Sequence, residues 1–277
     1  LAGGKDQLLY INLTDLVDGF GHKTDINTQS LYGRLWRDRL ENDSLESTDT
    51  LKQSFESNGF DTSYFQGKTV LDMGCGSGRF TLALSSFGAK EVVGIDLGDE
   101  GLSIAKKIAE EQNLNNVRFE KGSVLDLPFE NVAFDFIFCK GVLHHTGNLN
   151  KGVEELYRVL KKNGKAFLYL YGSGGLFWHS RIEAKKVMQQ IPLEYTLKIL
   201  SLIRMPAKRT IFVDNWYVAI EDFVDPLILE PFLKEIGFQK INRWKVGKDY
   251  HLETAVFKNL PNAKEIWGVG ELRYILE

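Results

Sequence analysis

The sequence predicts an α/β fold built on a doubly wound, mostly parallel β-sheet, and two observations support this prediction. Thr69 to Leu71 form a short apolar run that ends in Asp72, and a helical pattern begins at Arg79 after three glycines. Further apolar strand patterns then alternate with helical patterns as far as about residue 172. In such sheets ligands bind beyond the carboxyl ends of the strands, so the turn after Asp72 is the first candidate site.

The composition of this turn indicates which ligand it binds. Gly74, Gly76 and Gly78 follow Asp72 at alternate positions, with Cys75 inside the turn. A dinucleotide-binding turn has the different spacing Gly-x-Gly-x-x-Gly. The Asp72 carboxylate would repel a pyrophosphate and attract an ammonium group. S-adenosylmethionine carries both an ammonium and a sulfonium, so the pattern favours this cofactor over NAD.

At this turn the sequence resembles the class I S-adenosylmethionine-dependent methyltransferases. Within them it is most similar to the small-molecule group that includes ubiquinone and sugar methyltransferases, known as type 11. The resemblance covers residues 66–172 strongly and 221–259 less strongly. It implies a Rossmann-like, seven-stranded sheet whose last strand is antiparallel, with S-adenosylmethionine as cofactor and S-adenosylhomocysteine as product. The alternative is a glycine loop that closes an unrelated turn.

A second strand pattern, Glu91 to Ile95, ends in another acid, Asp96. An acid at this place accepts hydrogen bonds from the hydroxyls of a nucleoside ribose. The resemblance implies this role for Asp96 and places Leu97 against the adenine. Alternatively, Asp96 caps the helix that starts near Gly101.

The third strand pattern, Val117 to Lys121, leads into a segment that resembles the Gly-Asp-Ala-x-x-Leu-Pro-Phe segment of the family. Ser123 stands where the family has an aspartate that meets the adenine amino group, and its hydroxyl could make a similar bond. The neighbouring Val124 also belongs to the predicted cofactor site. Asp126 is not predicted to be a ligand.

The fourth strand pattern, Phe134 to Lys140, precedes His144 and His145 at the predicted mouth of the site, and Lys140 completes the predicted cofactor set. A hydroxyl acceptor needs a base to remove its proton, and histidine suits that task near neutral pH. The resemblance implies a structural role for His145, which makes His144 the better candidate for the base. The alternative is that both histidines only shape the loop.

The later part of the chain completes the predicted sheet. A fifth strand is expected over Lys165 to Tyr171, and a helix over Pro226 to Ile236 that ends at Gly237. Two further strands are expected. They span Phe238 to Val246 and His251 to Asn259.

These predictions divide the chain into a methyltransferase core, residues 66–172 and 221–260, and three further segments. The N-terminal cap segment is 1–65, the helical lid or substrate insertion is 173–220, and the C-terminal extension is 261–277. The insertion is expected to form two helices, Ser180 to Gln190 and Glu194 to Ile203, divided at Pro192.

Aromatic and basic residues in and beside these segments are candidates for contact with the acceptor. The candidates are Tyr32, Trp36, Tyr171, Trp178, Arg181 and Trp216. The insertion carries seven Lys or Arg residues against three Asp or Glu residues, which leads to the hypothesis of an anionic acceptor held by Arg181, Arg204 or Arg209. The alternative for the aromatic residues is packing in the core. The alternative for the basic residues is a helix face exposed to solvent.

Composition limits the remaining functions. A formal net charge of −3 argues against general attraction to nucleic acid, although an RNA methyltransferase stays an alternative. Two cysteines, Cys75 and Cys139, indicate neither a disulfide framework nor a zinc site. We expect no metal, no membrane-spanning segment and a cytoplasmic protein acting on a small molecule, with a homodimer left open. A non-catalytic protein that binds S-adenosylmethionine is the other alternative.

Overall fold

The computed structural model describes residues 46–202, 209–245 and 252–277. These residues form two compact units. The larger unit holds the described residues up to Trp178 and from Ile220 onward, and the smaller unit holds those between His179 and Ala219.

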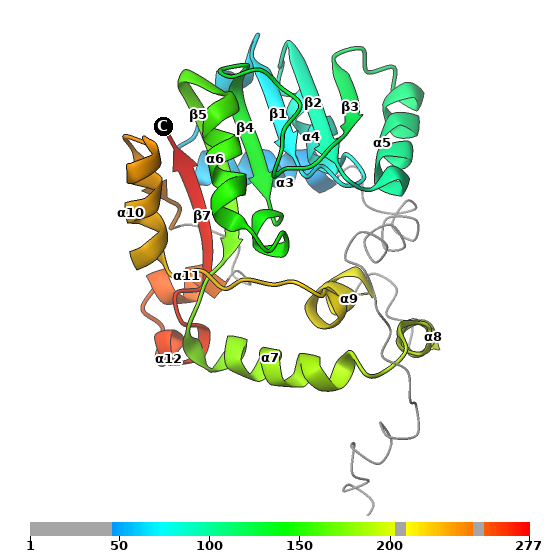
Figure 1. The fold of residues 1–277 in the computed structure, drawn as a ribbon, viewed down its shortest axis with the longest axis vertical. Coiled ribbons are helices and arrows are strands. Elements are labelled where there is room, and N and C mark those ends of the chain that lie inside the picture. The colour runs from blue at the N-terminus through cyan, green and yellow to red at the C-terminus, as the bar shows by residue number, and fades with distance from the viewer. Residues whose placement is uncertain (1–45, 203–208, 246–251) are drawn as a thin grey trace, which may run out of the picture. The chain divides into compact units, whose positions relative to one another are not determined.

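A seven-stranded sheet forms the centre of the larger unit, in the order β3-β2-β1-β4-β5-β7-β6 (Figure 1). Strands β1 to β5 pair in parallel, whereas β7 is antiparallel to both β5 and β6. The predicted fold class is therefore confirmed. The strands are β1 Thr69–Met73, β2 Glu91–Asp96, β3 Val117–Lys121, β4 Phe134–Lys140, β5 Leu160–Tyr171, β6 Ile241–Arg243 and β7 Glu271–Leu276.

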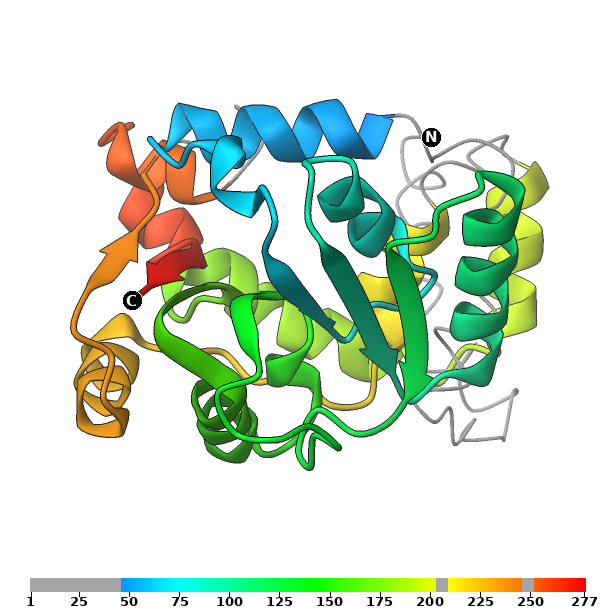
Figure 2. The same ribbon diagram turned by 90° about the horizontal axis from the view of Figure 1, so that it is seen from above.

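Helices cover both faces of this sheet, as Figure 2 shows. Side chains alternate along β1, so that Val70 joins a core cluster with helices α3 and α4, whereas Leu71 joins a cluster with α6 and α10. The helices of the larger unit are α3 Glu46–Ser57, α4 Arg79–Ser85, α5 Asp99–Glu111, α6 Leu149–Val159, α10 Pro226–Ile236, α11 Leu252–Phe257 and α12 Ala263–Trp267. Short 3-10 turns are η1 Thr62–Phe65 and η2 Leu143–His145.

Helix α10 shows how closely local signals fix an element. Asp225 caps it by accepting a hydrogen bond from the Leu227 amide at 2.8 Å, Pro226 opens it, and Gly237 ends it at φ +132°. Its bounds match the predicted helix.

The end of the chain differs from the prediction. The strand predicted over His251 to Asn259 is wrong, because Leu252–Phe257 is helix α11. The outer strand begins three residues later than predicted and is short, Ile241–Arg243. Residues 261–277, expected to be an extension, contain β7, which lies inside the sheet. Short apolar runs fit a helix and a strand about equally well. Glu271 and Arg273 alternate with Leu272 and Tyr274, as in a strand, but nothing local shows that this strand enters the sheet between β5 and β6.

The smaller unit is helical. Helix α7, Gly175–Met188, starts in the larger unit and continues into the smaller one, where α8 Leu193–Leu202 and α9 Arg209–Tyr217 follow. The hydroxyls of Thr196 and Tyr217 lie 2.5 Å apart and join α8 to α9. The two helices predicted for the insertion correspond to α7 and α8, whereas α9 was not predicted. Over the described parts of the chain, no helix is both long and apolar enough to cross a membrane.

Candidate active site at the carboxyl edge of the sheet

The glycine turn after β1 is bonded to the neighbouring strand. The amides of Gly74 and Cys75 both donate to the carbonyl of Ile95 in β2, at 2.8 and 2.9 Å. Gly78 precedes α4 with φ +77°, and a Cβ on it would lie 2.7 Å from Cβ of Ala105 on α5. The turn therefore needs glycine here for both backbone angle and space, and it fixes the start of α4 at the carboxyl edge of the sheet.

Asp72 is a buried carboxyl group, only 2% exposed, near the end of β1. Its Oδ2 accepts a hydrogen bond from Thr81 Oγ1 at 2.6 Å. Burial raises the pKa of Asp72 to about 7, and the hydrogen bond from Thr81 opposes this rise. A cation bound beside it would favour the ionised carboxylate, which fits the predicted ammonium partner.

Asp96, at the end of β2, links two glycine amides. Its Oδ2 accepts from the amide of Gly76 at 2.9 Å and its Oδ1 accepts from the amide of Gly98 at 2.8 Å. Burial raises the pKa of Asp96, and these backbone hydrogen bonds oppose the rise. The residue that caps α5 is Gly98, so Asp96 is not the N-cap of that helix.

The predicted adenine-side residues differ in exposure. Leu97 is 49% exposed, whereas Val124 is buried in the core cluster of α6 and α10. The Ser123 hydroxyl oxygen accepts a hydrogen bond from the Leu125 amide at 3.1 Å. Lys140, at the end of β4, lies with its Nζ 4.1 Å from the centre of the Phe80 ring. Its charge lowers the pKa of Asp72 slightly against the larger effect of burial.

The two histidines occupy η2, beyond β4, and differ in their surroundings. His144 is fully buried, with its ring centre 4.1 Å from those of His145 and Tyr171. His145 is half-buried, and its Nδ1 lies 2.8 Å from the carbonyl oxygen of Ile220. Because that oxygen can only accept, Nδ1 of His145 carries the proton, and Nε2 is the basic nitrogen of the neutral ring.

Tyr171 and Trp178 pack against each other. Their ring centres are 5.5 Å apart in a stacked arrangement, and both side chains are buried. The indole Nε1 of Trp178 donates to the carbonyl of Trp267 at 3.2 Å. These contacts resemble those of core residues, and a role in acceptor binding stays a prediction.

Sequence reasoning missed a polar cluster where β5 meets β7. The Tyr169 hydroxyl donates to Glu271 Oε1 at 2.6 Å, and Arg273 Nη2 donates to Glu271 Oε2 at 2.7 Å. The Arg273 guanidinium also lies 4.6 Å from the centre of the Tyr169 ring. Burial raises the pKa of Tyr169 well above its usual range. No local motif could reveal this cluster, because Tyr169 and Glu271 are 102 positions apart.

Within the smaller unit, Arg181 is buried and its Nε donates to the carbonyl of Asn215 at 3.3 Å. Trp216 is half-buried, with its ring centre 6.1 Å from that of Phe212. Tyr32, Trp36 and Arg204 lie outside the described residues.

Neither metal nor thiol chemistry is indicated in the described part of the chain. Residues 46–202, 209–245 and 252–277 contain no group of three or more His, Cys, Asp or Glu side chains that could hold a metal ion. Cys75 and Cys139 are buried free thiols, and burial raises the pKa of both. Such thiols are poor nucleophiles.

Comparisons with known proteins agree with this geometry. Residues 65–192 match the model of a family described as a methyltransferase domain. The uncharacterized methyltransferase YcgJ of Bacillus subtilis is 39% identical over 99 residues, which are 36% of this chain and 39% of that relative. The demethylmenaquinone methyltransferase of Oceanobacillus iheyensis is 34% identical over 101 residues, 36% of this chain and 42% of the relative. The crystal structure of an S-adenosylmethionine-dependent methyltransferase from Aquifex aeolicus gives a TM-score of 0.52 at 18% identity, covering 88% of this chain and 97% of that one.

The fold, the glycine turn and these matches together define the class of protein. Residues 65–192 carry a methyltransferase domain, and the seven-stranded sheet has the fold of class I S-adenosylmethionine-dependent methyltransferases, which confirms the predicted resemblance. The match spans about two fifths of the length of the two curated relatives, 39% and 42%.

Proposed function

We propose that this protein binds S-adenosylmethionine at the carboxyl ends of β1 and β2 and transfers its methyl group to a small-molecule acceptor. The observation that supports this most directly is the pair of carboxyl groups beside one glycine turn, the buried Asp72 and the half-buried Asp96. Asp72 suits the ammonium group of the cofactor, and Asp96 suits the two ribose hydroxyls. When bound, S-adenosylmethionine supplies a methyl group activated by its sulfonium.

The chain's own contribution to this reaction is positioning. The hydrogen bonds from the amides of Gly76 and Gly98 to Asp96 hold the turn in one conformation. The site is therefore formed before the ligand binds. Burial of the Asp72 side chain keeps water from its carboxyl group, which strengthens its interaction with a cation.

A hydroxyl acceptor would need a base, and the histidines of η2 are the candidates for it. His144 was the preferred candidate from the sequence, but its burial favours packing against Tyr171. His145 is half-buried, and the carbonyl of Ile220 fixes its tautomer. We therefore propose that His145 accepts the proton at Nε2 and that His144 supports it.

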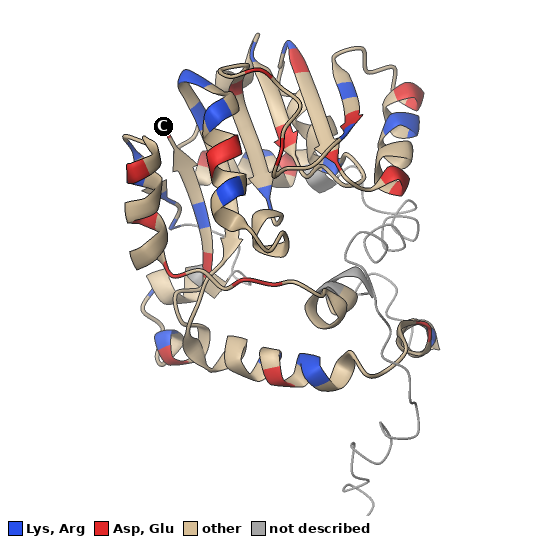
Figure 3. Ribbon diagram, viewed as in Figure 1, with Lys and Arg blue, Asp and Glu red and all other residues tan. Residues whose placement is uncertain are grey.

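The class of acceptor is also part of this proposal. The relative named for demethylmenaquinone supports a small molecule. Acidic and basic residues are mixed along α5 and α6 (Figure 3), which gives these helices no basic surface for nucleic acid. An anionic acceptor and a homodimer both stay as predictions from the sequence.

A transfer assay tests the proposal. The protein is incubated with S-adenosylmethionine labelled in the methyl group and with panels of hydroxy acids, quinols, amines and tRNA, and products are identified by mass spectrometry. A labelled small molecule that is absent with Asp96→Ala supports the proposal. Label in tRNA alone would select the RNA alternative, and tight cofactor binding without any product would select the non-catalytic one.

A second assay separates a hydroxyl acceptor from an amine acceptor. For a hydroxyl, we expect His145→Gln to lower kcat by about 100-fold or more and to remove the fall in rate at acidic pH. His144→Gln serves as the comparison. An unchanged pH profile in His145→Gln would contradict the proposed base.

A further inference from the structure

The loop between β3 and β4, residues 122–133, carries two of the predicted cofactor-site residues, Ser123 and Val124, at its start. The amide of Gly122 donates to the carbonyl of Asp96 at 3.0 Å, which joins the beginning of the loop to the cofactor edge. The loop contains neither a helix nor a strand. Its path must therefore be set by contacts with other elements.

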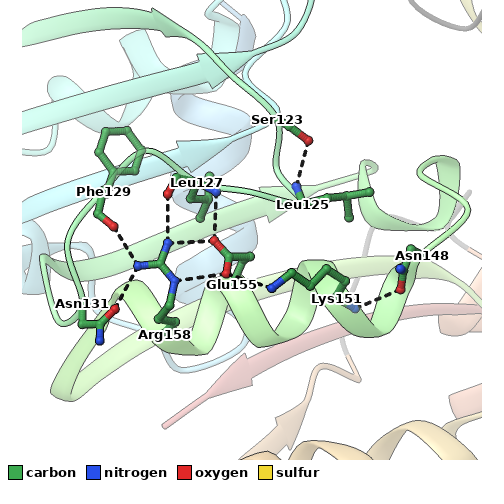
Figure 4. Close-up of polar contacts among 9 residues, drawn as sticks. All are labelled: Ser123, Leu125, Leu127, Phe129, Asn131, Asn148, Lys151, Glu155 and Arg158. Carbon is green, nitrogen blue, oxygen red and sulfur yellow. Dashed lines mark hydrogen bonds and ion pairs between the residues drawn. The ribbon is translucent and has the colours of Figure 1, made fainter.

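The side chain of Arg158 on α6 supplies three of these contacts, as Figure 4 shows. Its Nη1 donates to the carbonyl of Phe129 at 2.7 Å and to Oδ1 of Asn131 at 2.9 Å. Its Nη2 donates to the carbonyl of Leu127 at 2.9 Å. One side chain thus holds three acceptors, which lie between Leu127 and Asn131.

Glu155, one turn earlier on α6, orients this guanidinium. Its Oε1 and Oε2 accept from Nε and Nη2 of Arg158 at 3.0 and 2.7 Å, so all five N–H bonds of the guanidinium are used. Its Oε2 also accepts from the Leu127 amide at 2.8 Å. The Glu155 side chain is only 5% exposed. Hydrogen bonds from Arg158 lower the pKa of Glu155 to about 2, so the pair stays charged near neutral pH.

We infer that Glu155 and Arg158 are positioning residues for the cofactor, which hold the loop so that Ser123 meets the adenine. This inference rests on the proposed function. Both residues lie on α6, and they act on the adenine side through the loop. A lysine could not replace Arg158, because it lacks the planar fork of donors.

Calorimetric titration of the full chain tests this inference with two ligands that share adenine, S-adenosylhomocysteine and 5′-methylthioadenosine. We expect Arg158→Gln to weaken the binding of both by about 10-fold and by the same factor. Glu155→Gln is the milder variant, because its amide oxygen can still accept from the Leu127 amide, and it carries the test if Arg158→Gln does not fold.

Two control variants separate positioning from general destabilisation. Lys151→Met removes the 3.3 Å contact from Nζ to Glu155 Oε1 but no contact to the loop. Asp135→Asn weakens contacts of Asp135 Oδ2 with the Thr69 amide and Lys161 Nζ, at the start of β4 and away from the cofactor edge. We expect both controls to keep the affinity of the unmodified protein, even if Asp135→Asn lowers its melting temperature.

The outcomes distinguish this inference from the proposed function. Unchanged affinity in Arg158→Gln and Glu155→Gln would overturn the inference alone. A loss for S-adenosylhomocysteine without a loss for 5′-methylthioadenosine would also overturn it, because the affected side would not be the adenine. If the unmodified protein bound neither ligand, the proposed function would fail first.

Discussion

The two halves of the carboxyl edge are built in different ways. At β2 the Asp96 carboxylate accepts from the backbone amides of Gly76 and Gly98, and at β1 the Asp72 carboxyl accepts from the hydroxyl of Thr81, nine positions later in the chain. At β5 and β7 side chains bind one another across the sheet, as Tyr169 does with Glu271. The amides of Gly76 and Gly98 reach Asp96 only in one conformation of the turn, and few substitutions preserve that conformation. The contacts between side chains at β5 and β7 can change by substitution of the side chains, so this half can be adapted to a particular acceptor. We therefore propose that the cofactor binds at the first half and the acceptor at the second.

The largest effect should come from Asp96→Ala. Hydrogen bonds to a charged group contribute about 1.5–3 kcal/mol each, and this variant removes those that hold Gly76 and Gly98 as well as the proposed ribose contact. We expect the affinity for S-adenosylhomocysteine to fall by about 100-fold in calorimetric titration. Asp99→Asn is the control, because Asp99 is exposed and pairs with Lys121. This variant should bind S-adenosylhomocysteine as the unmodified protein does.

Gly74→Ala should have the next largest effect. This variant tests whether the turn must pass close to the side chain of Val142. A Cβ at Gly74 would lie 2.4 Å from Cγ2 of Val142, and φ is +83°. We expect a loss of stability of about 1–3 kcal/mol from the backbone angle alone, a further loss from the clash, and weaker cofactor binding. Gly59→Ala is a matched control, since φ is +75° there and nothing lies within 4 Å. Equal effects of the two variants on stability and binding would contradict the role of the close approach.

The pH dependence of stability should reveal Asp72. Its pKa is about 7 in the folded protein against 3.8 for an exposed carboxyl, so the unfolded chain loses this proton first as the pH rises. Asp72 therefore contributes up to about 4 kcal/mol to the free energy of unfolding. This contribution is fully present below pH 3.8 and is lost as the pH rises through 7. Chemical denaturation between pH 4 and 8 measures it. Asp72→Asn should remove this fall in the free energy of unfolding. If that free energy depended on pH in the same way in both proteins, Asp72 would ionise normally.

The smallest effect should come from Tyr169→Phe on the acceptor half. Removing the hydroxyl leaves Glu271 Oε1 without its 2.6 Å donor, and we expect a loss of about 1–2 kcal/mol in unfolding free energy. Cofactor affinity should stay within about 2-fold, while the acceptor KM changes. Tyr64→Phe, which removes a 3.1 Å hydrogen bond to the carbonyl of Asp135, is the control and should leave both constants unchanged. A large loss of cofactor affinity in Tyr169→Phe would remove the distinction between the halves.

The same contrast explains which features the sequence could predict. Asp72, the glycine turn and Asp96 lie within a short span and follow local rules, so strands, turn and acids could be predicted from them. The cluster of Tyr169, Glu271 and Arg273 forms only when β7 enters the sheet beside β5, and no local pattern predicts which strand β7 pairs with. The Glu155 and Arg158 pair has an ordinary helical spacing, and only the folded loop shows what it holds.

The central claim is that the two carboxyl groups at β1 and β2 bind an adenosyl cofactor. Its most direct test is calorimetric titration of the unmodified protein with S-adenosylmethionine, S-adenosylhomocysteine and NADH. We expect the protein to bind both adenosyl ligands and not to bind NADH. Binding of NADH, or of none of the three, would contradict it.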